Sequence, residues 1–291
     1  MKPPLHFPAA LSPGGLALRT AVMIFLGGTS FAFPPAPGFT VHGTVRDEFG
    51  WAVDSGEAAI VFKNPANGAV LARSAITAGG VITENYRATL PIDHGRTAEG
   101  YRDDAVAAGT AFTIEVTIQG VTYFPIPSVP AASATTRSAE FLQIDLTLGN
   151  DSDGDGLPDL WEQWQLEAAG LDPSQIGLIT RDGDPDGDGL SNHAEFVAGT
   201  FAFLGYDTLS LRYVELTPDH WSRLEFLAVI DKAYVLERSS DMRTWERAPF
   251  GLWRDRTDLK SDWMAPDTVL QTIETPPDGS GVQWFYRLTV H

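Results

Sequence analysis

The 291-residue sequence contains no cysteine, so disulfide bonds, thiolate metal sites, cysteine nucleophiles and thiol redox motifs are all excluded. Basic residues are also scarce: 20 Lys and Arg stand against 38 Asp and Glu, which gives a net charge of -18. A surface of this sign repels a nucleic-acid duplex or an anionic membrane on average. We therefore expect no nucleic-acid partner.

The sequence also lacks the usual motifs of catalysis. Its six histidines are scattered, and it contains no His-Glu-x-x-His, no Gly-x-Ser-x-Gly and no phosphate-binding loop. A pair of carboxylates for glycoside hydrolysis has no such signature, so the sequence leaves that chemistry open. We predict that the protein is not an enzyme, because a catalytic site normally leaves a recognisable set of residues.

Long hydrophobic runs are absent except near the N-terminus. Arg19 precedes an apolar run over residues 20–28, and Ser30 and Ala32 place small residues at the -3 and -1 positions of a cleavage site after Ala32. This pattern is typical of a signal peptide over residues 1–32; the alternative is a buried N-terminal helix. The run is too short to span a bilayer. We expect a mature chain without a transmembrane segment that is secreted, displayed at the cell surface or held in the periplasm.

The sequence has enough apolar material for stable cores, with 43% hydrophobic residues, 16 Phe and 8 Trp. Burial of such side chains offsets the entropy lost on folding, so the chain is globular. Its length favours two or three domains. The acidity is local, because residues 151–200 hold 12 acidic residues and one basic residue. We predict domain boundaries that give residues 33–150, 151–202 and 203–291.

Residues 33–150 have the pattern of an all-β domain with one buried face per strand. Apolar and polar residues alternate, or short apolar runs lie between turns, in 39–45, 59–62, 69–76, 86–92, 112–118, 121–124 and 142–148. About seven short strands at this spacing predict a two-sheet sandwich. The stretches 41–50 and 85–91 resemble the carboxypeptidase-regulatory, or transthyretin-like, β-sandwich of secreted proteins. The resemblance implies a scaffold and no catalysis.

The acidic segment contains the same twelve-residue pattern twice. Residues 151–162 are Asp-Ser-Asp-Gly-Asp-Gly-Leu-Pro-Asp-Leu-Trp-Glu, and residues 184–195 are Asp-Pro-Asp-Gly-Asp-Gly-Leu-Ser-Asn-His-Ala-Glu. Both match an EF-hand-like calcium loop, in which positions 1, 3, 5, 7, 9 and 12 bind the ion. The predicted ligands of two Ca²⁺ ions are Asp151, Asp153, Asp155, Leu157, Asp159 and Glu162 in the first loop and Asp184, Asp186, Asp188, Leu190, Asn192 and Glu195 in the second.

Each of these positions has a chemical reason. Calcium takes about six to eight oxygen ligands, so carboxylates must converge from a loop that wraps the ion. Glycine at position 6 permits the sharp bend, leucine at position 7 offers its backbone carbonyl, and glutamate at position 12 closes the site with two oxygens. A solvated acidic linker is the alternative, but a linker has no reason to repeat these residues at matching offsets. Starting the second loop at Asp182 instead puts His193 at position 12 and loses the closing carboxylate.

A short helix is predicted after each loop. Apolar residues recur at helical spacing before Gly170 and again before Gly199, at Leu157, Leu160, Trp161, Trp164 and Ala168 and at Leu190, Ala194 and Val197. We expect Trp161 and Trp164 to pack in a core. No helix is expected before the first loop, because the predicted strand ends at Leu148. Pro158 at position 8 also lacks the N–H that paired EF-hands exchange.

With these departures the segment resembles the Asp-rich calcium repeats of thrombospondin type 3 and dockerin-like modules, as found in secreted multidomain bacterial surface proteins. The resemblance rests on residues 151–162 and 186–200. Dockerin loops usually close with Asp where this chain has Glu162 and Glu195, and the cysteines of animal thrombospondin repeats are missing. The resemblance implies a calcium-bound connecting segment.

Residues 203–291 have the pattern of a second β-domain. Strand-like runs lie at 209–214, 224–229, 234–240 and 284–290. The stretches 234–245 and 285–288 resemble the C-terminal sandwich that often follows such calcium repeats. Four tryptophans of this region either pack in its core, which is the usual role of aromatic side chains, or form a sugar-stacking platform. They are Trp221, Trp245, Trp253 and Trp263.

We therefore expect a mainly β protein in which two β-sandwich domains are joined by a short calcium-binding loop-helix segment. The predicted function is that of a secreted, non-enzymatic calcium-binding protein. Two Ca²⁺ ions rigidify the joint between the domains, in surface adhesion or matrix interaction with a protein or glycan ligand. Two alternatives stay open: a carbohydrate-binding accessory module that uses the C-terminal tryptophans, and a dockerin-like adaptor that binds a protein partner.

Overall fold

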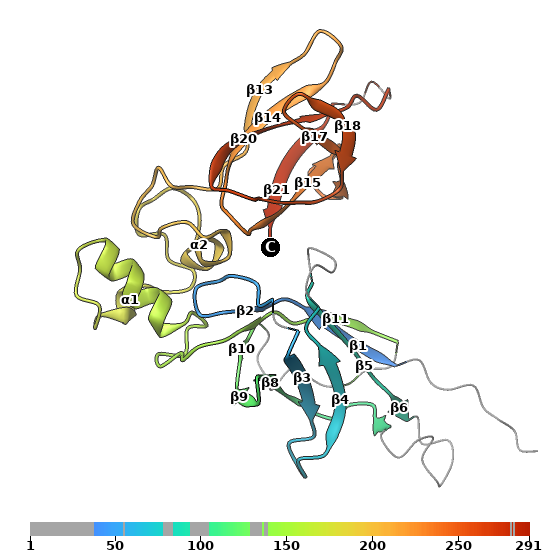
Figure 1. Ribbon diagram of the computed structural model, residues 1–291, viewed down its shortest axis with the longest axis vertical. Coiled ribbons are helices and arrows are strands. Elements are labelled where there is room, and N and C mark those ends of the chain that lie inside the picture. The colour runs from blue at the N-terminus through green and yellow to red at the C-terminus, as the bar shows by residue number, and fades with distance from the viewer. Residues whose placement is uncertain are drawn as a thin grey trace, which may run out of the picture. The chain divides into compact units, whose positions relative to one another are not determined.

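The computed structural model describes residues 38–54, 56–77, 84–93, 105–128, 136, 139–279, 281 and 283–291. The predicted signal peptide, residues 1–32, lies outside the described residues. The described residues belong to one compact unit, in which strands far outnumber helices (Figure 1). The prediction of a mainly β fold is therefore confirmed. No helix in the described ranges is long and apolar enough to cross a membrane.

The strands of the N-terminal region form small sheets with the orders β11-β1-β5, β10-β12-β2, β4-β3-β8-β9 and β6-β7. Their bounds are β1 (Phe39–Gly43), β2 (Val45–Arg46), β3 (Ala58–Lys63), β4 (Val70–Ala75), β5 (Tyr86–Leu90), β6 (Ile92–Asp93), β7 (Val106–Ala107), β8 (Thr113–Ile118), β9 (Val121–Tyr123), β10 (Ile126–Pro127), β11 (Phe141–Gln143) and β12 (Leu146–Thr147). Strand β1 lies between antiparallel β5 and parallel β11. Each alternating run predicted in this region contains at least one of these strands.

These sheets share one hydrophobic core, to which strands of different sheets contribute alternate side chains. In β5, Tyr86, Ala88 and Leu90 are buried and the residues between them are exposed, as the two-residue period of a strand requires. The buried Tyr86 hydroxyl donates to the Ile144 carbonyl at 2.5 Å, so this polar atom has a partner inside the core. The alternation seen in the sequence is thus the pattern that fills the core.

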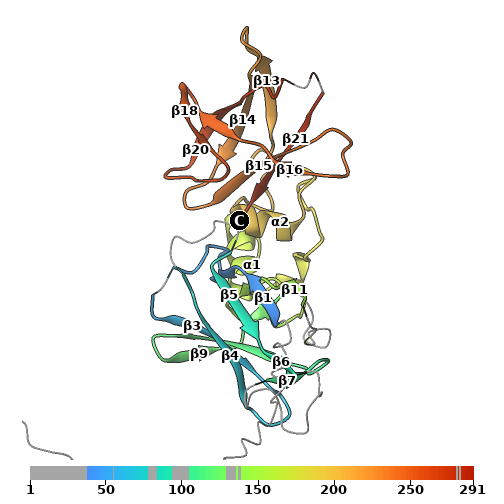
Figure 2. The ribbon, with the colours of Figure 1, turned by 90° about the vertical axis from the view of Figure 1, so that its right-hand side faces the viewer.

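The C-terminal strands form two sheets, β13-β14-β20-β17-β18 and β16-β15-β19, with β21 also paired to β15 (Figure 2). Their bounds are β13 (Arg212–Leu216), β14 (Ser222–Ala228), β15 (Ala233–Ser239), β16 (Glu246–Arg247), β17 (Phe250–Leu252), β18 (Asp255–Lys260), β19 (Trp263–Met264), β20 (Val269–Thr275) and β21 (Phe285–Val290). Phe226 of β14 and Tyr234 of β15 meet in a second core, with ring centres 4.8 Å apart. Both sheets therefore contribute to one core.

The segment between the two β-regions contains the short helices α1 (Asp159–Ala168), η2 (Ile176–Leu178, a 3-10 turn) and α2 (Asn192–Ala198). The prediction of a helix after each loop is confirmed, and both helices end where glycine was expected: Gly170 has φ +72° and Gly199 has φ +79°. Trp161 is 1% exposed and its ring meets that of Phe196 edge-on at 5.6 Å in a third core. Leu160 and Ala168 share the apolar spacing but are exposed, Leu160 by 42%.

The turn at residues 47–50 packs against this segment and against the C-terminal region. A Cβ atom on Gly50, whose φ is +86°, would lie 2.2 Å from the Phe196 carbonyl oxygen. The Phe49 ring meets the Trp164 ring edge-on at 6.0 Å. The buried Lys232 ammonium donates to the Gly50 carbonyl at 2.8 Å. One turn of the N-terminal region therefore contacts both later parts of the chain.

Replacing Gly50 with alanine tests this close packing. A left-handed φ costs a non-glycine residue about 1–2 kcal/mol, and overpacking against the Phe196 carbonyl adds about 1–3 kcal/mol. Gly68→Ala is the matched control, because Gly68 has φ +72° and a Cβ atom there would meet no other atom within 4 Å. We expect Gly50→Ala to lower the free energy of unfolding by at least about 1 kcal/mol more than Gly68→Ala in urea denaturation. Equal losses would contradict the contact.

Candidate metal centres

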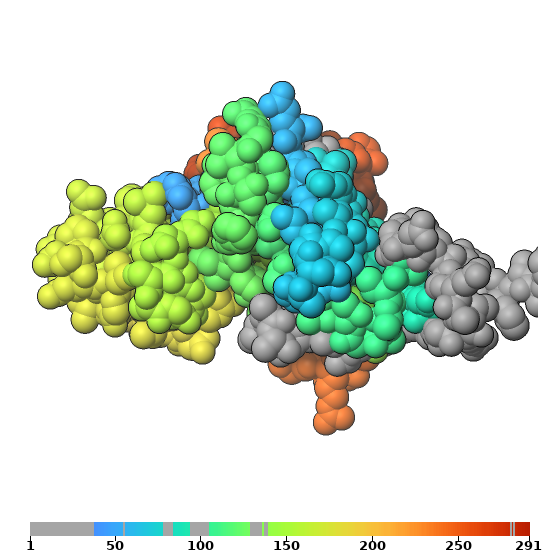
Figure 3. Space-filling model, turned by 90° about the horizontal axis from the view of Figure 1, so that it is seen from below, coloured from blue at the N-terminus to red at the C-terminus, as the bar shows by residue number. Residues whose placement is uncertain are grey.

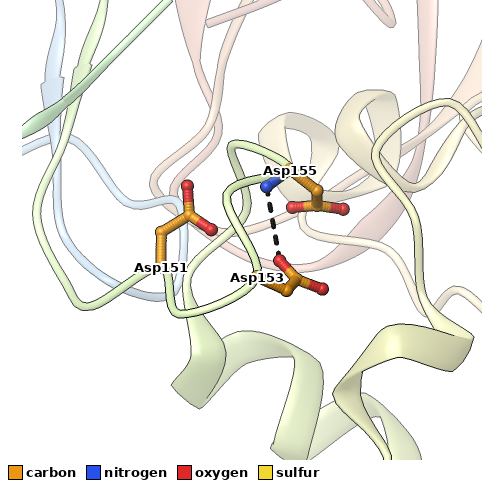
Figure 4. Close-up of side chains that lie close together, drawn as sticks. All are labelled: Asp151, Asp153 and Asp155. Atoms are coloured by element: carbon orange, nitrogen blue, oxygen red, sulfur yellow. Dashed lines mark hydrogen bonds between the residues drawn. The ribbon is translucent and has the colours of Figure 1, made fainter.

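Each acidic loop brings the side chains of its positions 1, 3 and 5 together. Ligand oxygens of Asp151, Asp153 and Asp155 all lie within 4.8 Å of one another, and the same holds for the corresponding residues of the second loop, Asp184, Asp186 and Asp188. Figure 4 shows the three carboxylates of the first loop around one turn of the backbone, with the Asp155 N–H donating to Asp153 at 3.3 Å. The spacing predicted from the sequence is therefore realised in both loops.

The two loops are built in the same way from backbone hydrogen bonds to the first aspartate. Asp151 accepts from the N–H groups of Gly154 at 2.8 Å and Gly156 at 3.1 Å. In the second loop Asp184 accepts at the same two distances from Gly187 and Gly189. The position-6 glycines, 156 and 189, have φ of +96° and +97°, a conformation that few other residues adopt. The glycine at position 6 is thus required by the backbone.

The closing glutamates are the most unusual groups in the segment. Glu162 and Glu195 are both 0% exposed, and none of their four carboxylate oxygens has a hydrogen-bond partner among the described residues. Burial, followed by the charges of the loop aspartates, raises the pKa of Glu162 to about 9 and that of Glu195 to about 8. A buried carboxylate without a partner is strongly unfavourable, so each glutamate needs a proton or a cation beside it.

Other oxygens of the two loops share this lack of partners. Over the described part of the chain, buried side-chain atoms without a hydrogen bond include Asp155 Oδ2 beside Glu162 in the first loop, and Asp186 Oδ2, Asp188 Oδ2 and Asn192 Oδ1 beside Glu195 in the second. Native proteins leave few such atoms, and ion binding is one of the accepted reasons for them. These oxygens are hard donors of the kind that calcium takes. The donor set of each loop therefore fits a calcium ion.

The residues at position 9 differ between the loops. Asp159 accepts from the Ser152 N–H at 2.7 Å and from the Asn150 side chain at 2.5 Å, so both of its oxygens hold the start of the first loop in place. Asn192 donates to the Thr180 carbonyl at 2.7 Å and leaves its own side-chain oxygen free. Asp159 does not belong to the tight group of carboxylates of its loop. Their assignment as ligands, direct or through water, stays a prediction.

The leucines at position 7 also differ. The Leu157 side chain is fully buried in the third core, whereas Leu190 is only partly buried. The backbone N–H of each donates to the position-5 aspartate, at 2.8 Å to Asp155 and at 2.7 Å to Asp188. The structure thus anchors position 7 beside the aspartates in both loops. Ligation through its carbonyl stays a prediction.

Two residues near the loops were not expected from the sequence. Arg181 donates from Nη1 to the Gly156 carbonyl at 3.2 Å, and its own carbonyl accepts from the His193 N–H at 3.0 Å, so it contacts both loops. Asp207 lies beyond the second loop, and burial together with the Asp188 charge raises its pKa. Arg181 could have been singled out as the single basic residue within 151–200. Asp207 has no such signal.

The C-terminal tryptophans are mostly covered by arginine. Guanidinium groups lie over the rings of Trp221 (Arg256, 4.6 Å), Trp245 (Arg287, 4.3 Å) and Trp253 (Arg223, 4.2 Å), which is the geometry of a cation–π contact. Trp263 instead packs against the second core, 6.2 Å from the Tyr234 ring. Each of these four rings therefore has at least one neighbour inside the protein, which reduces the ring surface left for a sugar.

Comparison with known proteins adds no relative: no family model, no curated protein and no solved structure matches the chain. The resemblance to thrombospondin type 3 and dockerin-like repeats stays a prediction. The case for the candidate metal centres therefore rests on their geometry alone.

The raised pKa values predict how stability without metal depends on pH. The folded-state pKa values of Glu162 and Glu195 lie above an unfolded value near 4.5, so the stability that these groups contribute is present below that value and is lost as pH rises towards 8–9. The double variant Glu162→Gln/Glu195→Gln mimics the protonated glutamates, so its stability should not fall in this way as pH rises. In chelator, we expect the double variant to gain at least about 1 kcal/mol over the wild type between pH 5 and pH 9.

Urea denaturation of both chains at several pH values measures this difference, because histidine and lysine titrations common to both cancel. The matched control is Glu167→Gln, a change of the exposed glutamate on α1. A difference between the double variant and the wild type that does not change with pH would contradict the prediction.

Proposed function

We propose that this protein is a secreted, non-enzymatic calcium-binding protein in which two Ca²⁺ ions rigidify a joint between two β-sandwich domains. Its context would be surface adhesion or matrix interaction. The observation that carries the proposal is the pair of fully buried glutamates, Glu162 and Glu195, whose oxygens have no partner within the described structure and which lie among the loop aspartates. A divalent cation satisfies those oxygens and offsets the charge at once.

The residues of each loop would share the work of holding the ion. Positions 1, 3 and 5 supply converging carboxylates, and position 12 supplies two oxygens from the first turn of the following helix. Asp151 and Asp184 also accept backbone N–H groups, which fixes the loop before the ion arrives. Bound calcium supplies the positive charge that lets these acidic groups remain ionised together.

The joint is a reasonable place for such ions because the loop-helix segment is small. Its core depends on a few large side chains, chiefly Trp161 and Phe196, and each of these is the chain neighbour of a closing glutamate. The segment also touches the N-terminal region through Phe49 and Trp164. Fixing the loops would therefore fix the core and, through it, this contact. The chain has no disulfide that could do the same.

Calcium titration tests the proposal directly. Extracellular calcium modules bind at about 0.1–1 mM, so about 10 mM calcium should raise the melting temperature by about 5 °C or more over chelator. Calorimetry should show about two ions per chain. Glu162→Gln or Glu195→Gln should each remove about one ion, whereas the control Glu167→Gln, an exposed change on α1, should keep both. No heat of binding and no shift in melting temperature would overturn the proposal.

For the carbohydrate-binding alternative, the structure offers a different candidate site from the four tryptophans that the sequence indicated. A cleft of about 690 Å³ in the C-terminal region is lined by Tyr213, Trp284 and Tyr286 together with His220 and Gln283. Aromatic rings with a few polar groups are the usual lining of a small-ligand site. Tyr213 is 55% exposed on the edge strand β13, so its ring is open to a ligand. The Trp284 ring itself lies under the Arg238 guanidinium at 4.3 Å, so the alternative rests on the exposed ring of Tyr213.

A glycan array distinguishes the two locations. If the chain binds a glycan, Tyr213→Ala should weaken binding by about fivefold or more, because stacking of this kind contributes about 1 kcal/mol or more. Trp253→Ala, whose ring already lies under Arg223, should leave binding within about twofold. The opposite pattern would place the site on the tryptophans, and no binding by the wild type would remove the alternative.

The third possibility is a dockerin-like adaptor that binds a protein partner through the calcium segment. It rests on the helix that follows each loop, and much of the surface of this segment is open on the face shown in Figure 3. Capture of one defined partner in calcium, lost in chelator and in Glu162→Gln/Glu195→Gln, would support it.

A further inference from the structure

A small pocket of about 40 Å³ lies beside the first loop and is lined mainly by basic and polar groups from distant parts of the sequence. Arg46 comes from β2, Ser128 follows β10, Asp145 precedes β12, and Arg181 and His193 come from the loop-helix segment, with Gly156 of the first loop at one side. The pocket is separate from the two groups of loop carboxylates. Neither the proposed calcium sites nor the carbohydrate alternative uses it.

Arg46 is the most constrained group of this pocket. It is 4% exposed, and its Nε–H is buried without a hydrogen-bond acceptor in the described structure. Arg46 forms an ion pair with Asp145, whose carboxylate lies 3.4 Å from Nη1 and also accepts a hydrogen bond from the Thr44 N–H. A buried guanidinium donor without an acceptor is costly. An acceptor that enters the pocket beside Arg46 would therefore be stabilising.

The neighbouring groups also offer donors. The Arg181 guanidinium packs against Gly156: a Cβ atom on Gly156 would lie 2.8 Å from Arg181 Nη1. The same Nη1 donates a hydrogen bond to the Gly156 carbonyl. The Ser128 oxygen accepts from the Asp145 N–H at 2.9 Å, which leaves the hydroxyl proton available for donation. The lining thus has two guanidinium groups against one carboxylate. It carries one positive charge in excess.

We propose that this pocket binds one small monovalent anion, and that the anion is chloride. A water molecule needs at least about 10–15 Å³, so the pocket of about 40 Å³ has room for one halide ion. Chloride accepts hydrogen bonds and donates none, as a lining of donors requires. Water alone would leave the excess charge of Arg46 and Arg181 unbalanced.

Chloride in this position would connect two parts of the chain that share few other polar contacts. Arg46 belongs to the N-terminal region, and Arg181 contacts both acidic loops. An anion held between them would fix Arg181 against the first loop. The only carboxylate in the lining is that of Asp145, which is not a predicted calcium ligand, so the anion site does not rest on the function proposed above.

Three measurements on the wild-type protein test this proposal. In saturating calcium and at constant ionic strength, sodium methanesulfonate, whose anion is bulkier than chloride, is replaced stepwise by sodium chloride. We expect a saturable rise in melting temperature of about 2–8 °C and excess broadening of the ³⁵Cl resonance. A crystal grown in sodium bromide should show an anomalous peak between Arg46 and Arg181. No saturable effect of chloride and no bromide peak would mean that water fills the pocket, which overturns the proposal.

Variants locate the effect. Arg46→Met should abolish the chloride response. This change also removes the ion-pair partner of Asp145 and could unfold the chain, so a second variant, Ser128→Ala, is needed. Ser128 is exposed, and its loss should weaken chloride binding by about 2–10-fold. The control is Arg243→Met, a change of an exposed arginine outside the pocket, which should leave the response unchanged. An equal loss in Arg243→Met would overturn the proposal. A chloride response that persists in chelator, with no calcium binding, would reject the calcium function and keep the anion site.

Discussion

Burial of two carboxylates among like charges is the constraint on which the middle of this molecule depends. Glu162 and Glu195 have no exposed surface, and each has aspartates of its own loop as its charged neighbours. No lysine or arginine forms an ion pair with either glutamate within the described part of the chain. Each glutamate in the folded segment therefore needs an added positive charge, either a proton below its raised pKa or a cation.

The buried glutamates also affect the packing of the third core, because loop residues and core residues are neighbours along the same helices. Trp161 directly precedes Glu162, and Phe196 directly follows Glu195. In each pair one side chain is directed to the acidic loop and the other to the third core, where the two rings meet at 5.6 Å. The closing glutamate of each loop and the ring packed in the core are thus held by the same helix, one residue apart. The acidic residues in the first helical turn also interact favourably with the helix dipole, but that effect is far smaller than the repulsion.

The parts that could be predicted from the sequence are those whose information is local. The loop spacing, the position-6 glycines and the helix ends at Gly170 and Gly199 all follow from a few neighbouring residues, and the structure has each of them. Strand β18 could not be predicted, because Asp255–Lys260 has one apolar residue and is ordered by pairing with β17. The arginines over the tryptophan rings were not predictable for the same reason. Arg223 reaches Trp253 across thirty positions of sequence, and only the sheet brings them together.

Arg181 shows how much of the charge balance is tertiary. It is the single basic residue in a segment with 12 acidic ones, and by composition alone it would neutralise one of them. The structure uses it otherwise, because its guanidinium bonds to a backbone carbonyl, that of Gly156, and lies in a pocket with a second arginine. The guanidinium of Arg181 therefore neutralises neither closing glutamate, and within the described structure the oxygens of Glu162 and Glu195 are left without a partner. Had Arg181 paired with one of these glutamates, that buried carboxylate would have its counter-charge within the protein. The fold instead keeps the acidic groups of each loop together and the segment's basic side chain in a separate pocket.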